Sequence, residues 1–112
     1  MAGAFNMFAT GIGTTDAGFI MGTGKLLVKV PATMRFYLEG KLPKGVMAKD
    51  VVLHVIGDIG SDGATYRALQ YEGPGVHAMS MDDRMTIANM AIEAGGKNGV
   101  FPADEKTFAY VD

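Results

Sequence analysis

The segment Ser80–Gly95 constrains the fold more than any other part of this chain, because it contains the start, the apolar face and the end of one helix. Ser80 is a favourable N-cap residue, and Asp83 three positions later completes a capping box. Gly95 follows the last apolar residue and favours a left-handed helix end. The segment therefore predicts a single helix whose core-facing side carries Met81, Met85, Ile87, Ala88, Ala91, Ile92 and Ala94.

A second face of this predicted helix is polar. It carries Asp82, Thr86, Asn89 and Glu93, which are spaced so that all four lie on one stripe. The helix dipole mildly disfavours a glutamate in the last turn, so a role other than helix stability would explain Glu93. On the pattern alone a solvated face is the simpler interpretation, and a functional face is the alternative.

Strands and helices alternate along the rest of the chain. β-branched and alternating apolar segments predict strands at 26–30, 34–38, 66–71 and 99–101. Periodic apolar segments with end signals predict helices from Thr15 to about Gly22–Gly24, at 48–59 and from Asp104. Residues 2–13 are expected to be irregular or loosely helical, and Gly73-Pro74-Gly75 is expected to be a turn. Helices between strands imply crossover connections, so the predicted fold is α/β with a mostly parallel sheet.

The composition is that of a globular domain without a strong charge bias. Among 112 residues, 48% are hydrophobic and the net charge is −2, which gives no electrostatic sign of nucleic-acid binding. No basic run marks a membrane surface, and the apolar stretch 2–21 is interrupted by polar residues and glycines, which argues against a spanning helix or a signal peptide. We therefore expect a cytoplasmic protein that binds neither nucleic acid nor membrane.

Other common sites are not supported by spacing. Gly22–Lys25 lacks the first glycine and the final Ser or Thr of a P-loop, and Asp16 occupies the third glycine position of a dinucleotide fingerprint that starts at Gly11. His54 and His77 have no neighbour at metal-ligand spacing, so no metal site is predicted. His54 is expected to be a partly buried structural residue.

Longer motifs occur in order along nearly the whole chain. They are Gly11–Asp16, Gly24-Lys25, Val28–Pro31, Thr33, Leu38–Val46, Ala48–Val51, Asp62–Tyr66, the helix described above, Phe101-Pro102 and Asp104–Thr107. With these motifs the chain resembles the aconitase superfamily of iron–sulfur hydro-lyases, and most of all the large subunit of 3-isopropylmalate dehydratase and homoaconitase.

The resemblance implies roles for two residues of the polar stripe. In the family's Asn-Met-x-x-Glu motif, Asn89 corresponds to an asparagine beside a [4Fe–4S] cluster, and Glu93 corresponds to a carboxylate in the catalytic pocket. An amide can donate to cluster sulfide, and a carboxylate can accept from bound water or hydroxyl. The implied reaction is dehydration and rehydration of a hydroxy di- or tricarboxylic acid, of the 3-isopropylmalate or homoaconitate type, as in leucine biosynthesis.

The same resemblance places most of the catalytic machinery outside this chain. The family holds its cluster through three cysteines, and this chain has none; the family's catalytic serine base lies on a separate domain or small subunit. We therefore expect an interior segment of a large subunit, inactive and without a cluster when alone, whose partners are the remainder of that subunit and a small subunit.

Two further expectations concern organisation. The family pattern assigns residues 1–33 to the tail of a preceding α/β domain and residues 34–112 to most of a second one. Apolar surface left uncovered by missing neighbours predicts self-association of the isolated chain. The alternative function is an autonomous, non-catalytic α/β scaffold or oligomerisation module derived from such an enzyme.

Overall fold

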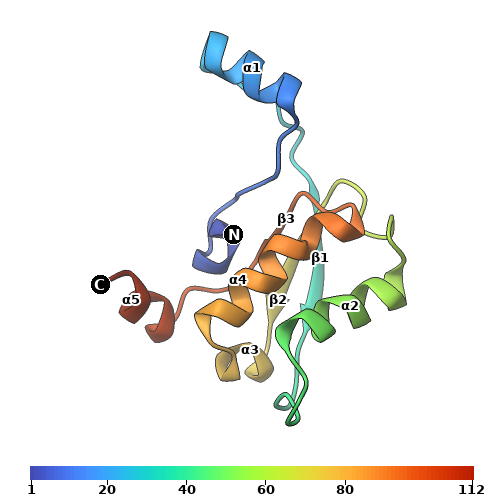
Figure 1. Ribbon diagram of the computed structural model, residues 1–112, viewed down its shortest axis with the longest axis vertical. Coiled ribbons are helices and arrows are strands. Elements are labelled where there is room, and N and C mark those ends of the chain that lie inside the picture. The colour runs from blue at the N-terminus through green and yellow to red at the C-terminus, as the bar shows by residue number, and fades with distance from the viewer.

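The computed structural model describes residues 1–112 and shows helices packed on one face of a three-stranded sheet (Figure 1). Strand order is β1-β2-β3 and both pairs are parallel, with Met34 opposite Leu69 and Leu69 opposite Gly99. The predicted α/β fold with a parallel sheet is therefore confirmed. The strands are β1 (Ala32–Tyr37), β2 (Arg67–Glu72) and β3 (Asn98–Val100).

The helices form the crossover connections that a parallel sheet requires. The α2 helix connects β1 to β2, and α3, α4 and the 3-10 segment η2 connect β2 to β3. Helices α2 and α4 lie side by side over the sheet (Figure 1). The full set is η1 (Ala2–Phe5), α1 (Thr14–Thr23), α2 (Ala48–Ile59), α3 (Pro74–Ala78), α4 (Met81–Met90), η2 (Ala91–Ala94) and α5 (Glu105–Val111).

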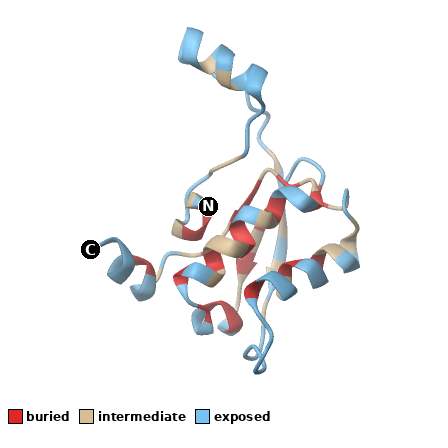
Figure 2. Ribbon diagram, viewed as in Figure 1, coloured by how far each residue is buried: buried red, intermediate tan, exposed pale blue.

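The core lies between the inner face of the sheet and these helices, as the buried segments in Figure 2 show. Leu69 and Tyr71 of β2 are fully buried there, together with Ile87 of α4. The ring of Tyr71 stacks between those of Phe36 and Phe101, at centroid distances of 5.3 and 5.0 Å. This aromatic stack joins β1, β2 and the residue that follows β3.

The predicted helix Ser80–Gly95 is correct at its start and end but not continuous. Ser80 Oγ accepts from the Asp83 backbone N–H at 3.2 Å, and the Asp83 carboxylate accepts from the Ser80 N–H at 3.0 Å, which completes the predicted capping box. The α-helical part ends at Met90 and tightens into η2, which ends at Gly95 in the left-handed conformation. A 3-10 last turn of this kind is common at helix ends.

Two other local predictions were wrong. Residues 26–30 form no strand, and Leu27 and Val30 are 94% and 87% exposed, because no neighbouring strand is present to pair with them. The segment Gly73-Pro74-Gly75 is not a simple turn, because Pro74 is the first residue of α3. Proline is favoured there, since the first helical N–H has no partner within the helix.

The outer face of the sheet and helix α1 are largely exposed to solvent. Thr33, Arg35 and Tyr37 point outward from β1 and are exposed, whereas the alternate residues Met34 and Phe36 are half-buried. No residue of α1 is buried, and Figure 1 shows this helix projecting away from the rest of the chain. Parallel sheets are normally covered on both faces, so this face differs from that of a finished α/β domain. No helix of the structure is both long enough and apolar enough to span a membrane.

Candidate functional site

Asn89 and Glu93, the two predicted site residues, lie where α4 passes into η2. Asn89 is in the last turn of α4 and Glu93 is in η2, and both side chains are exposed. Neither takes part in any of the four ion pairs of the chain. Thr86, on the same stripe, is half-buried and donates to the Asp82 carbonyl at 2.9 Å. The amide and the carboxylate therefore remain available to an external group.

Backbone hydrogen bonds fix this region against the beginning of the sheet. The N–H of Ala64 donates to Ala94 O at 3.0 Å, and the N–H of Tyr66 donates to Gly95 O at 3.0 Å. Gly95 has φ +79°, and a Cβ at this position would lie 3.1 Å from Thr65 Oγ1. Glycine is thus required both by the left-handed conformation and by the close approach of the β2 segment.

A pocket of about 220 Å³ lies beside Asn89. Its far side is formed by Ala9, Thr10 and Gly11, the last of which begins a motif that carried the family resemblance. Asn89 lines this pocket, but Glu93 does not. The structure therefore brings Asn89 and the Gly11 segment together, and leaves Glu93 on the adjacent surface. Besides Asn89, the polar residues that line the pocket are Thr10, Lys97 and Asn98.

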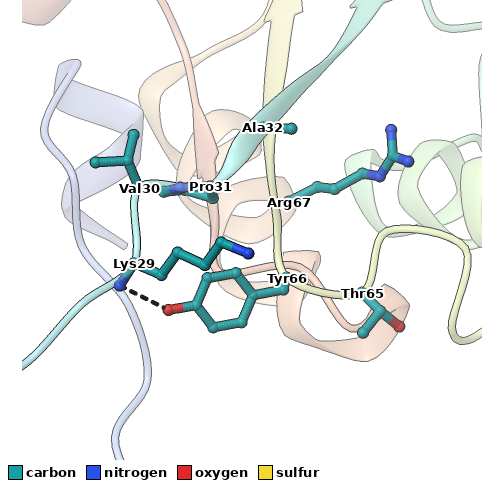
Figure 3. A pocket seen from close by; sticks show the side chains of 7 residues that line it. All are labelled: Lys29, Val30, Pro31, Ala32, Thr65, Tyr66 and Arg67. Carbon is teal, nitrogen blue, oxygen red and sulfur yellow. Dashed lines mark hydrogen bonds between the residues drawn. The ribbon is translucent and has the colours of Figure 1, made fainter.

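A second, more open pocket of about 500 Å³ lies where the segment that leads into β1 meets the start of β2 (Figure 3). The Tyr66 hydroxyl accepts from the Lys29 N–H at 3.0 Å, the contact drawn as a dashed line in Figure 3. Tyr66 has φ 55°, a left-handed conformation that is costly for a residue with a side chain. The Lys97 ammonium lies 4.5 Å from the centre of the Tyr66 ring, and Lys97 also lines the pocket beside Asn89.

An ion pair between Arg84 and Asp104 supports α4, and the sequence did not predict it. Arg84 is fully buried and donates to both carboxylate oxygens of Asp104, at 2.9 and 2.6 Å, and to Val76 O at 3.2 Å. The hydrogen bonds from Arg84 hold the pKa of Asp104 well below its usual range. A signal was present, because Arg84 lies three residues after Met81 and four before Ala88, on the core-facing stripe.

His54 was expected to be partly buried, and this prediction was wrong. Its side chain is 80% exposed and lies 3.5 Å from the Asp58 carboxylate one turn along α2. The apolar stripe of α2 is formed instead by Val52 and Val55, so His54 faces solvent. The pair is a surface contact, which contributes little to stability.

The residues of this chain do not fit an iron–sulfur cluster. Such clusters are held by thiolate ligands, and the chain contains no cysteine. No group of three or more histidine, aspartate or glutamate side chains is arranged to hold a metal ion. What the region does offer is a hydrogen-bonding amide at Asn89, a free carboxylate at Glu93 and a lysine side chain at Lys97.

Comparison with known proteins places these features in a family context. Residues 1–112 match the sequence profile of the Aconitase family (aconitate hydratase). The chain is 56% identical over 111 residues to the chloroplastic 3-isopropylmalate dehydratase large subunit of Arabidopsis thaliana, covering 99% of this chain and 22% of that protein. It is 57% identical over 110 residues to the 2,3-dimethylmalate dehydratase large subunit of Eubacterium barkeri, covering 98% and 26%.

A third relative has a comparable sequence identity to this chain. The 3-isopropylmalate dehydratase large subunit of Clostridioides difficile is 53% identical over 110 residues, covering 98% of this chain and 26% of that protein. The chain therefore spans about a quarter of the length of these relatives. All three are described as large subunits of dehydratases.

Proposed function

The chain belongs to the aconitase family, and from this premise we propose that it supplies an amide and a carboxylate to the active site of a hydro-lyase large subunit. The observation that carries the proposal is the position of Asn89 and Glu93, the family-matched residues. Both are exposed and unpaired beside the N-terminal ends of β2 and β3. Exposed side chains without partners are also common on a solvated face, so it is the match of both residues to the family motif that supports a functional role.

The proposed roles follow from the chemistry of dehydration. Dehydration removes a hydroxyl group from one carbon and a proton from its neighbour, which leaves a double bond and water. The Glu93 carboxylate accepts a hydrogen bond from the substrate hydroxyl or from bound water, and in its protonated form it can donate the proton with which the hydroxyl departs as water. Asn89 donates from its amide to a negatively charged group beside it. A [4Fe–4S] cluster in the complete enzyme would have its thiolate ligands outside this chain.

The proposed substrate is a hydroxy dicarboxylic acid of the isopropylmalate type, because relatives that are 53–57% identical are named for 3-isopropylmalate or 2,3-dimethylmalate. The proposed partners are the remainder of a large subunit and a small subunit. We also propose that residues 1–33 end one α/β domain and residues 34–112 form most of another. Alone, the chain is expected to have no turnover.

A segment exchange tests this function. Residues 1–112 would replace the matching segment of the Clostridioides difficile large subunit, which is then assembled with its own small subunit and assayed with 3-isopropylmalate. At 53% identity the exchanged segment is expected to be accommodated, and turnover should remain within about tenfold of the parent enzyme.

A folded exchange enzyme without turnover would contradict the proposal. The control is the isolated chain, which should be inactive under the same conditions. An isolated chain that forms stable, defined oligomers, together with an inactive exchange enzyme, would instead support the alternative scaffold function.

A further inference from the structure

Residues 10–30 form an arm that few contacts hold to the rest of the chain. The arm carries α1, and Figure 1 shows α1 joined to the body of the molecule by two extended segments. No residue from 10 to 30 is buried, and none of them takes part in an ion pair. The only hydrogen bond between the arm and another part of the chain runs from the Lys29 N–H to the Tyr66 hydroxyl, at 3.0 Å (Figure 3).

Tyr66 is itself held firmly on the body of the molecule. Its N–H donates to Gly95 O at 3.0 Å, at the end of η2. The Lys97 ammonium lies over its ring, 4.5 Å from the ring centre, which is a cation–π contact. Tyr66 therefore offers its hydroxyl to the arm from a fixed position.

The backbone of Tyr66 indicates that its side chain is needed at this position. Its φ of 55° lies in the left-handed region, which is unfavourable for a residue with a bulky side chain. Glycine adopts this conformation without steric cost, but it has no side chain to bind the arm. Strained residues persist where surrounding contacts hold them, often where the strain serves a function. Of the two contacts of the Tyr66 side chain, only the bond to Lys29 requires the hydroxyl.

The first segment of the arm begins beside Asn89. Ala9, Thr10 and Gly11 form one side of the pocket of about 220 Å³ that Asn89 also lines. Gly11 and Lys29 belong to the two segments that join α1 to the body of the molecule, so a movement of α1 acts on both. An arm released at Lys29 would therefore shift one wall of the pocket beside Asn89.

We propose that Tyr66 is a clasp: its hydrogen bond to Lys29 fixes the arm on the body of the molecule and thereby keeps residues 9–11 in place beside Asn89. Removing this one hydroxyl releases the arm without unfolding the sheet, because the arm contributes no residue to the core. The inference concerns the conformation of the chain itself and goes beyond the proposed function. An inactive segment-exchange enzyme would leave it intact.

Distances between spin labels test the clasp on the chain itself. The chain has no cysteine, so labels attach only at cysteines that are introduced for the purpose. Met21→Cys on α1 with His54→Cys on α2 forms one pair, at two highly exposed positions. Ile12→Cys with His54→Cys forms a second pair, which reports on the segment beside the Asn89 pocket. An excess of unlabelled chain suppresses distances between molecules.

The parent chain should give one narrow distance distribution for each pair. Tyr66→Phe keeps the ring and its contact with Lys97 but removes the hydroxyl. Both distributions should therefore broaden at least about twofold, and the Lys29 amide should exchange its hydrogen at least about tenfold faster by NMR. Tyr37→Phe, the same change at an exposed tyrosine of β1, is the matched control and should leave both measurements unchanged.

Circular dichroism of each variant verifies that the fold is intact. Broad distributions in the parent chain, or distributions in Tyr66→Phe equal to those of the parent, would overturn the clasp. Equal broadening in Tyr37→Phe would do the same, because the effect would then not depend on the bond to Lys29. Broadening of the Met21 pair alone would also overturn the proposal, since residues 9–11 would then be held independently of Tyr66.

Discussion

At the scale of single residues, the polar atoms without partners carry most of the information. The structure contains unpaired buried atoms on three side chains, Tyr71, Arg84 and Asn98. Asn98 faces a pocket, whereas Tyr71 lies inside the aromatic stack, where burial raises the pKa of its phenol. An unpaired buried hydroxyl such as that of Tyr71 is an internal cost to stability.

The hydroxyl of Tyr71 is predicted to destabilise this chain. Tyr71→Phe keeps the stacked ring and removes an unpaired buried hydroxyl, so it should raise the free energy of unfolding by about 1 kcal/mol. Tyr37→Phe, at an exposed strand position, is the control and should change stability by less than about 0.5 kcal/mol. Urea denaturation of both variants makes the comparison; a less stable Tyr71→Phe would show that the hydroxyl has a partner.

At the scale of elements, most local signals were read correctly, with the turn at Gly73–Gly75 and the burial of His54 as exceptions, whereas non-local contacts were not predicted. The capping box at Ser80, the left-handed end at Gly95 and the limits of α2 depend on residues close in sequence, and the sequence predicted all of them. Residues 26–30 have strand-like composition, but a strand also needs a neighbour to pair with. Arg84 was left unassigned because its partner, Asp104, is twenty positions away on the cap of α5.

The candidate site shows the same difference between local and non-local sequence signals. Asn89 and Glu93 were found through a family motif, which is local in sequence, and their exposure agrees with a solvated face as well as with a functional one. The pocket beside Asn89 could not be found in this way, because residues 9–11, distant in the sequence, form one side of it.

The end of η2 provides an element-scale test. Gly95→Ala forces a left-handed conformation on a residue with a Cβ and presses that Cβ against Thr65. We therefore expect the free energy of unfolding to fall by about 1–3 kcal/mol. Gly57→Ala is the matched control, because Gly57 lies inside α2 with nothing within 4 Å, and there alanine should stabilise by up to about 1 kcal/mol. Equal effects in thermal unfolding would contradict the strained geometry at Gly95.

The link between α4 and α5 predicts a dependence on pH. The pKa of Asp104 is lowered in the folded chain, chiefly by its hydrogen bonds from Arg84. The ionised carboxylate therefore stabilises the fold above the unfolded-state pKa of about 3.9, and this stabilisation is lost as the pH falls below that value. Asp104→Asn leaves Arg84 buried without a counter-ion and should cost about 3–5 kcal/mol at pH 7. The difference in the free energy of unfolding between Asp104→Asn and the parent chain should become smaller below pH 4.

Denaturation curves at pH 7, 5, 4 and 3 measure this difference. Asp82→Asn, at an exposed carboxylate that forms no ion pair, should change stability little at any of these values. A cost of Asp104→Asn that stays constant with pH would exclude the ion pair as its source.

At the scale of the whole molecule, two surfaces lack the cover that they would have in a finished domain. One is the outer face of the parallel sheet, and the other is the apolar segment around α1 and residues 26–30 (Figure 2). The chain spans about a quarter of the length of its relatives, and we propose that the remaining polypeptide covers these surfaces. The isolated chain is accordingly expected to self-associate.

Self-association can be traced to one surface by mutation. The double variant Leu27→Ser and Val30→Ser removes two apolar side chains that are 94% and 87% exposed, and should shift sedimentation velocity profiles toward monomer without lowering stability. Phe108→Ser, at an exposed position on α5, serves as the control and should leave association unchanged. A parent chain that stays monomeric at every concentration would contradict the prediction.

The most direct test of the central claim, that the α4–η2 junction belongs to a catalytic centre, is the turnover of the segment-exchange enzyme carrying Glu93→Gln. The matched control is Glu39→Gln, the same chemical change at an exposed loop residue. We predict that kcat falls at least about 100-fold for Glu93→Gln, with the melting temperature unchanged, and that Glu39→Gln keeps full activity. Equal turnover in the two variants would contradict the assignment of Glu93, and with it the proposed role of this helix junction.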